Sequence, residues 1–271
     1  LWAATSKGLW SSPNALDAQT PCANVAWSLK GGLPQQSGTP EPVRQIFKSA
    51  WANATYYAAV VRAVVSSKNG WWRSVDSGAT WQQPAPTPGS GPPEASSPLD
   101  FGRSAIVTSQ DAPAGQADKD ILYSSVWHQS GVTRLYRAVI PALPAASPTI
   151  TWTMLTTPAD TAGIRSVRVQ PNNRNVLALG SIYLYRSVNA GATFQAVGGS
   201  VLHVDHNGLT FDPTDANRFY DGSDGGVFRT DSFCPNPATC PLPAFVEKNG
   251  SLANFEFYQA GIDPRNFGVT Y

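Results

Sequence analysis

Charge is scarce in this chain. Asp, Glu, Lys and Arg together make up 14% of its 271 residues, and 19 basic residues stand against 18 acidic ones. A net charge of +1 lacks the basic excess with which nucleic-acid-binding proteins attract phosphates. No run of about 18 apolar residues occurs, which is the length that a membrane-spanning helix requires. The sequence therefore predicts neither a nucleic-acid partner nor a membrane span.

Cysteine is almost as rare, with three residues in the chain. Cys234 and Cys240 enclose a short Pro-rich loop that has no other evident stiffener, and we predict a local disulfide between them. Cys22 is then left over, either free or paired with a cysteine from a missing segment. Cys-x-x-Cys and paired His/Cys spacings are absent, so no structural zinc site is predicted.

Glycine, proline and aromatic residues are abundant instead, with 23 Gly, 23 Pro and 9 Trp. Sparse charge leaves few polar helix faces, and aromatic and β-branched residues favour strands. This composition is typical of extracellular β-proteins. We expect an all-β protein that is secreted or displayed on a cell surface.

One short strand motif recurs five times, at intervals of about 40 to 65 residues. The copies lie at 8–11, 70–74, 134–138, 183–187 and 226–230. Repeats of this length fit one four-stranded antiparallel blade each. The pattern predicts a β-propeller.

Two of the copies continue into a sharper signature. Its residues are Ser74, Asp76, Gly78, Thr80 and Trp81 in one copy, and Ser187, Asn189, Gly191, Thr193 and Phe194 in the other. The Asp or Asn side chain binds nearby backbone N–H groups, and Gly supplies the positive-φ turn position. The signature resembles the Asp-box, or BNR repeat, of sialidases, sortilin (VPS10-like) receptors and xyloglucanase-like hydrolases. The resemblance implies a structural hairpin between the third and fourth strands of a blade.

These repeats predict a single β-propeller domain over residues 1–271. Its blades are expected at about 1–30, 43–82, 101–155, 164–197 and 206–247, with a sixth beginning at 255–271. We expect the five blades to belong to a larger ring of about seven, with the remaining blades in a missing part of the chain. A closed five-bladed ring is the alternative.

The fifth blade gathers the most reactive side chains. In a propeller, the turn leading into an inner strand and the turn between strands two and three open on the same face. This rule brings together His203, Asp205, His206 and Asp224. The segment Ser223-Asp224-Gly225-Gly226-Val227-Phe228-Arg229 resembles one in xyloglucanase-like family 74 glycoside hydrolases, in which the Asp is a catalytic carboxylate.

The resemblance implies a catalytic role for Asp224, with Asp205 as a second carboxylate, since glycoside hydrolysis needs an acid and a base. In that family, however, the second carboxylate comes from a different part of the ring. Alternatively, Asp224 caps the turn, while His203, Asp205 and His206 form a hydrogen-bonded network that locks the inner strand. A divalent cation at these three residues is less favoured, so no cofactor is predicted.

Three arginines, Arg44, Arg103 and Arg165, stand at the starts of successive inner strands. Their planar guanidinium groups would point towards the central tunnel, where they could bind an anionic ligand. The wider sialidase pattern is not visible. The alternative is that these arginines pair with neighbouring carboxylates or carbonyl groups.

Two sequons for N-glycosylation occur, Asn53-Ala54-Thr55 and Asn249-Gly250-Ser251. Two matches are near chance in a Ser/Thr-rich chain, and they matter only in a eukaryotic secretory host.

Two functions follow from these observations. The first is a carbohydrate-related role on the face that carries the fifth-blade loops, either glycan binding or glycoside hydrolysis. The second is a non-enzymatic scaffold of the sortilin-like type that binds a protein partner. The fold alone does not choose between them.

Overall fold

The structure is a computed structural model that describes residues 1–49, 54–61, 66–88, 90, 120–127, 133–140, 149–158, 163–236 and 238–250. Within these ranges the only helical segments are two short 3-10 turns, η1 (Cys22–Asn24) and η2 (Ser66–Lys68). None of the described helices is long and apolar enough to cross a membrane.

The strands form five antiparallel sheets in chain order, plus one small hairpin. The first sheet holds β1 (Trp2–Thr5), β2 (Gly8–Ser11) and β3 (Ser28–Leu29). The second holds β6 (Val43–Lys48), β7 (Tyr56–Val60) and β8 (Gly70–Ser74), and the third holds β9 (Asp120–Trp127), β10 (Thr133–Ile140) and β11 (Trp152–Leu155). The hairpin pairs β4 (Gln35–Gln36) with β5 (Thr39–Pro40).

The fourth and fifth sheets have four strands each. The fourth comprises β12 (Ser166–Gln170), β13 (Asn173–Gly180), β14 (Leu184–Ser187) and β15 (Gln195–Ala196). The fifth comprises β16 (Gly208–Phe211), β17 (Phe219–Ser223), β18 (Gly226–Thr230) and β19 (Val246–Glu247). In both, neighbours in sequence are neighbours in the sheet, as expected for propeller blades.

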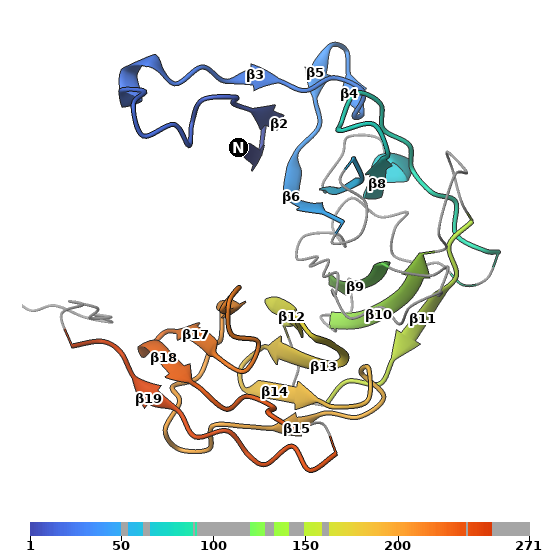
Figure 1. The fold of residues 1–271 in the computed structure, drawn as a ribbon. Coiled ribbons are helices and arrows are strands. Elements are labelled where there is room, and N and C mark those ends of the chain that lie inside the picture. Colours follow the sequence, from blue (N-terminus) through green and yellow to red (C-terminus); the bar gives the residue numbers. More distant parts are fainter. Residues whose placement is uncertain are drawn as a thin grey trace, which may run out of the picture.

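The five sheets follow one another along an arc, from blue β2 at one end to orange β17–β19 at the other (Figure 1). The chain is thus all-β and forms part of a β-propeller, which confirms the predicted fold class.

Apolar side chains fill each space between consecutive sheets. Tyr57 and Trp71 of the second sheet pack with Leu122 and Tyr136 of the third. Because side chains alternate along a strand, β9 also sends Tyr123 in the opposite direction, into the cluster with the fourth sheet. Further clusters join the first sheet to the second and the fourth to the fifth. Each fully buried large side chain contributes about 1.5–3 kcal/mol.

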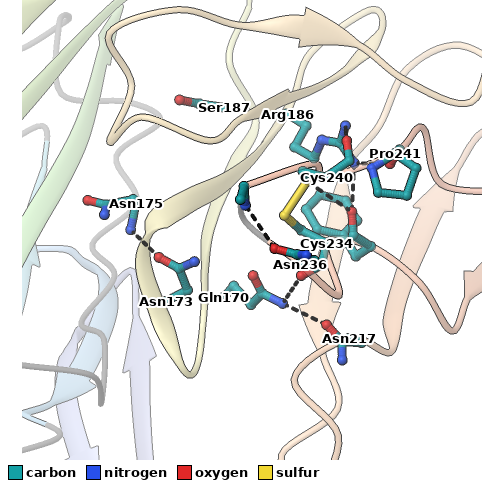
Figure 2. Close-up of a disulfide and its surroundings, with 12 residues drawn as sticks. Gln170, Asn173, Asn175, Arg186, Ser187, Asn217, Cys234, Asn236, Cys240 and Pro241 are labelled. Atoms are coloured by element: carbon teal, nitrogen blue, oxygen red, sulfur yellow. Dashed lines mark hydrogen bonds between the residues drawn. A yellow bond between two sulfur atoms is a disulfide. The ribbon is translucent and has the colours of Figure 1, made fainter.

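A buried arginine joins the fourth sheet to the fifth (Figure 2). On β14, Tyr185 packs towards the third sheet, so Arg186 points the other way. Its Nη1 donates to the carbonyl oxygens of Phe233 and Pro241, both at 2.7 Å, and its Nη2 donates to that of Cys240 at 2.8 Å. Burial lowers the pKa of Arg186, and the three carbonyl dipoles face its charge.

The loop that supplies these carbonyls is closed by a disulfide between Cys234 and Cys240, whose Cα atoms lie 4.9 Å apart. This confirms the predicted pairing. Gln170 of β12 also donates to the Cys234 carbonyl, at 3.3 Å, so a second side chain of the fourth sheet holds the loop. Cys22 is exposed and free. A disulfide fits an extracellular or other oxidising location.

The loop after β8 is built on the side chains of Ser74 and Asp76. Asp76 Oδ1 accepts from the Ser74 hydroxyl at 2.8 Å and from the Thr80 N–H at 2.9 Å. The Ser74 hydroxyl oxygen accepts from the N–H of Gly78, whose φ is 78°. Trp81 then lies buried between the first two sheets.

The loop after β14 repeats this bonding. Asn189 Oδ1 accepts from the Ser187 hydroxyl and from the Thr193 N–H, both at 2.9 Å, and the Gly191 N–H donates to the Ser187 hydroxyl. Phe194 packs against the cluster between the third and fourth sheets. Two sequence segments about a hundred residues apart thus form one local structure, because both carry the same few turn-forming side chains.

The acidic loop should make stability depend on pH. Hydrogen bonds from the Thr80 hydroxyl and N–H, and from Ser74, lower the pKa of Asp76 from 3.8 to about 2. The carboxylate therefore stabilises the fold above about pH 4, and this contribution is lost as the pH falls through about 2. We expect Asp76→Asn to fold, since Asn189 fills the same position in the other loop. Its free energy of unfolding should decline less between pH 4 and 2 than that of the unaltered protein. Parallel pH profiles from chemical denaturation would contradict this.

Arg186 should be the more sensitive of two corresponding arginines. Arg186→Met leaves three carbonyl groups without their donor, and we expect it to lower the free energy of unfolding by about 3 kcal/mol. Arg229 occupies the corresponding repeat position on β18, is partly exposed and pairs with exposed Asp231. Arg229→Met should therefore cost less than about 1 kcal/mol. Equal losses in urea unfolding would show that the carbonyl contacts of Arg186 add nothing.

Candidate functional site

Four side chains form a continuous hydrogen-bonded row where the fourth sheet meets the fifth. Arg165 Nη2 lies 2.7 Å from Asp205 Oδ1, and Arg165 Nη1 donates to Asn207 Oδ1 at 3.2 Å. The Asn207 amide nitrogen in turn donates to Asp224 Oδ1 at 3.3 Å. We call Arg165, Asp205, Asn207 and Asp224 the polar row.

The polar row is open to solvent. The side chains of Arg165 and Asp205 are each 28% exposed, and Asn207 and Asp224 are exposed. Arg165 directly precedes β12 of the fourth sheet, whereas the other three members belong to the fifth. The row therefore crosses the seam between two sheets, and a ligand bound to it would contact both.

Backbone contacts hold residues 203–207 against the fourth sheet. The N–H of Asp205 donates to the carbonyl of Ile182 at 2.9 Å, and that of His206 donates to the carbonyl of Ser181 at 2.8 Å. Asp205 has a φ of 70°, a left-handed conformation that Asp tolerates better than most residues. The direction of its carboxylate towards Arg165 thus depends on a constrained backbone.

His206 does not belong to the polar row. Its side chain is 2% exposed, and its Nδ1 lies 2.9 Å from both carboxylate oxygens of Asp221, which is fully buried. This contact joins the segment that precedes β16 to the middle of β17. It fits the alternative in which histidine locks the inner strand, rather than the one in which it faces a ligand.

His203 lies at the surface beside the turn that joins β17 to β18. Its Nδ1 is 3.2 Å from the Val204 carbonyl oxygen. A Cβ atom on Gly225 would collide with the His203 side chain, so the two are in direct contact. Of the four residues predicted to lie together, His203 thus lies next to the turn that carries Asp224, Asp205 and Asp224 belong to the polar row, and His206 is buried.

Of the three predicted arginines, the structure describes Arg44 and Arg165. Arg165 pairs with Asp205 of the neighbouring sheet, which fits the alternative of pairing with a nearby carboxylate. Arg44 is exposed on β6, and Arg103 lies outside the described residues. Among the described residues, no three His, Cys, Asp or Glu side chains come together as a metal site would require.

Two contacts at this place were not predicted from the sequence. Asn207 is the link between Arg165 and Asp224, and its only signal was its place between His206 and Gly208. Asp221 is a buried carboxylate, and its signal was a charged residue at an inward position of a strand, two residues after Phe219. Such a residue is almost always paired.

The loop that binds the backbone of residues 205 and 206 also carries an exposed aromatic residue. Tyr183, in the loop between β13 and β14, is 49% exposed. Its neighbours Ser181 and Ile182 bind the backbone of His206 and Asp205.

The buried pair should matter for stability. Removing His206 leaves the Asp221 carboxylate buried without its partner, so we expect His206→Ala to lower the free energy of unfolding by about 3 kcal/mol. Denaturant unfolding monitored by tryptophan fluorescence would measure this loss. His203→Ala is the matched control, and because His203 is exposed it should change stability by less than about 0.5 kcal/mol. A loss below 1 kcal/mol for His206→Ala would contradict the interpretation.

Comparisons with known proteins give a structural similarity only. No protein-family model matches the sequence, and no curated protein matches it. The structure is similar to a GH74 enzyme of Niastella koreensis at a TM-score of 0.55 and 18% identity, over 90% of this chain and 35% of that one.

Weaker similarities extend to YCF48 of Cyanidioschyzon merolae and to a GH74 xyloglucanase of Xanthomonas campestris. The first has a TM-score of 0.42 and 18% identity over 69% of this chain and 49% of that one. The second has a TM-score of 0.38 and 15% identity over 74% and 38%. This chain spans about a third of the length of the Niastella enzyme. What the similarity to that enzyme shows for this chain is the β-propeller fold.

Proposed function

We propose that this chain is part of a secreted Asp-box β-propeller that binds carbohydrate at the polar row. The observation that carries the proposal is the row itself, an exposed series of hydrogen-bonding groups across the seam between two sheets. The disulfide and the low charge support secretion. The repeated bonding of the 74–81 and 187–194 loops supports their assignment as Asp-boxes.

The chemistry of the row suits sugar hydroxyl groups. A hydroxyl both donates and accepts, and the row offers carboxylate acceptors, guanidinium donors and an amide that does both. Asp224 receives one hydrogen bond within the row, from Asn207, and its exposed carboxylate can accept more. The Tyr183 ring supplies an apolar face against which the C–H side of a pyranose can pack.

Binding is favoured over hydrolysis by the state of Asp205. Its carboxylate is ion-paired with Arg165 at 2.7 Å, so it orients the guanidinium group. Hydrolysis at Asp224 would need another carboxylate across the ligand. The fold similarity to a GH74 enzyme, together with the resemblance of the 223–229 segment to family 74 glycoside hydrolases, supports a carbohydrate ligand in either case.

A protein-binding scaffold is the second candidate. The observation in its favour is an exposed apolar pair in the first sheet region, Trp27 and Leu29, since apolar surface often marks a protein interface. This pair lies in a different sheet from the polar row, so the two functions can be tested separately.

The test compares two exposed aspartates at opposite ends of β18. We expect Asp224→Asn to weaken the binding of a responsive polysaccharide at least tenfold, a difference of about 1.4 kcal/mol. Asp231→Asn, at the far end of the strand, should leave affinity unchanged. Affinity electrophoresis of the full-length protein over a polysaccharide panel, followed by calorimetry, measures both.

Tyr183→Ala should also weaken binding, by several-fold, without lowering thermal stability, since the ring is half exposed. Mass spectrometry of the same mixtures reports any released oligosaccharide. Release that Asp224→Asn abolishes would make the site hydrolytic. If no polysaccharide binds while both variants fold normally, the carbohydrate proposal fails and the scaffold function takes its place.

A further inference from the structure

Asn249 holds the turn that carries Asp224, although it lies outside the polar row. Its side-chain oxygen accepts from the N–H of Val227 at 2.7 Å, and its side-chain nitrogen donates to the carbonyl of Gly225 at 2.8 Å. The amide of one side chain thus satisfies two backbone groups on either side of Gly226.

The backbone at Gly226 has the conformation that this contact requires. Its φ is 111°, and a Cβ atom there would collide with the Asn249 amide. The N–H of Lys248 donates to the Val227 carbonyl at 2.8 Å, which extends the pairing of β19 with β18. The last strand of the fifth sheet therefore delivers Asn249 directly onto the turn.

The turn is held from two other sides as well. His203 packs against Gly225, and Asn207 donates to the carboxylate of Asp224. A turn with two consecutive glycines has wide conformational freedom. Without the Asn249 contacts, the side-chain contacts that the described residues still make with this turn are those of His203 and Asn207.

We infer that Asn249 is a positioning residue for the Asp224 carboxylate and not an acceptor for N-linked glycan, despite its sequon. The part of this inference that concerns ligand affinity rests on the proposed carbohydrate function. The amide nitrogen that a glycan would occupy is bonded to Gly225 and in contact with Gly226. A glycan that replaces the hydrogen donated to Gly225 would break this contact, so we expect glycosylation and the observed turn to exclude each other.

The first experiment reads the turn without any ligand. In Asn249→Ala, we expect the Val227 amide to lose at least tenfold protection in hydrogen exchange, and the side-chain amide signal of Asn207 to shift in NMR spectra. The spectrum of Asp224→Asn identifies which part of that shift reports the Asn207–Asp224 contact. Lys248→Ala, which keeps its backbone bond, is the control and should change neither signal.

A milder substitution distinguishes the loss of these contacts from misfolding of the whole protein. Asn249→Asp keeps an oxygen that accepts from Val227 but places another oxygen against the Gly225 carbonyl, so its effects should be intermediate. Unchanged Val227 protection and an unchanged Asn207 signal in Asn249→Ala, with the protein folded, would overturn the inference whatever the ligand.

Ligand affinity then separates the two proposals. We expect Asn249→Ala to weaken glycan binding about tenfold while the melting temperature stays within a few degrees. If Asp224→Asn weakens binding and Asn249→Ala does not, the positioning role is wrong and the proposed function stands. If neither weakens binding, the proposed function fails, and the NMR signals alone decide on Asn249.

Expression in a eukaryotic secretory host tests the sequon. Peptide mass spectrometry of the folded, secreted protein should find Asn249 without glycan. Full occupancy at Asn249 combined with unaltered Val227 protection would overturn the claim that glycan and turn exclude each other.

Discussion

The sheets in the middle of the arc, such as the third and fourth, are apolar on both faces. The rest of the structure follows from that constraint. A strand such as β9 sends Leu122 to one side and Tyr123 to the other, so its sheet cannot be covered by one layer alone. The described chain has no long helix to do this, and each sheet must be covered by the next sheet along. The arc of Figure 1 results.

Two charged side chains buried in the packed layers each make more than one polar contact. The Arg186 guanidinium group meets three carbonyl oxygens, and the Asp221 carboxylate meets one imidazole through both oxygens. Both contacts tie consecutive elements together, Arg186 between two sheets and His206 between the 203–207 segment and β17. The Arg186 contacts act across the seam between the fourth and fifth sheets, which also carries the polar row, whereas the His206 contact lies within the fifth.

The fold could be predicted because its signals are local and repeated. Turn residues and a recurring strand motif need no knowledge of distant contacts, and neither does the pairing of Cys234 with Cys240 across a short loop. The site was harder to predict from the sequence. The propeller rule located His203, Asp205 and Asp224, but the roles of Asn207, Asp221 and Asn249 depend on strand register and side-chain direction, which spacing alone does not give. For the same reason, His206 looked like a surface ligand although it is buried.

The polar row has members on two sheets, and neither sheet holds the whole of it. In a protein built from repeats, a gene duplication that adds one sheet also adds one seam. Arg165 and the 203–207 segment could then diverge separately, since each is encoded in a different repeat. Ligand recognition in such a molecule can evolve at the seams between sheets, while the sheets themselves stay under constant selection for packing.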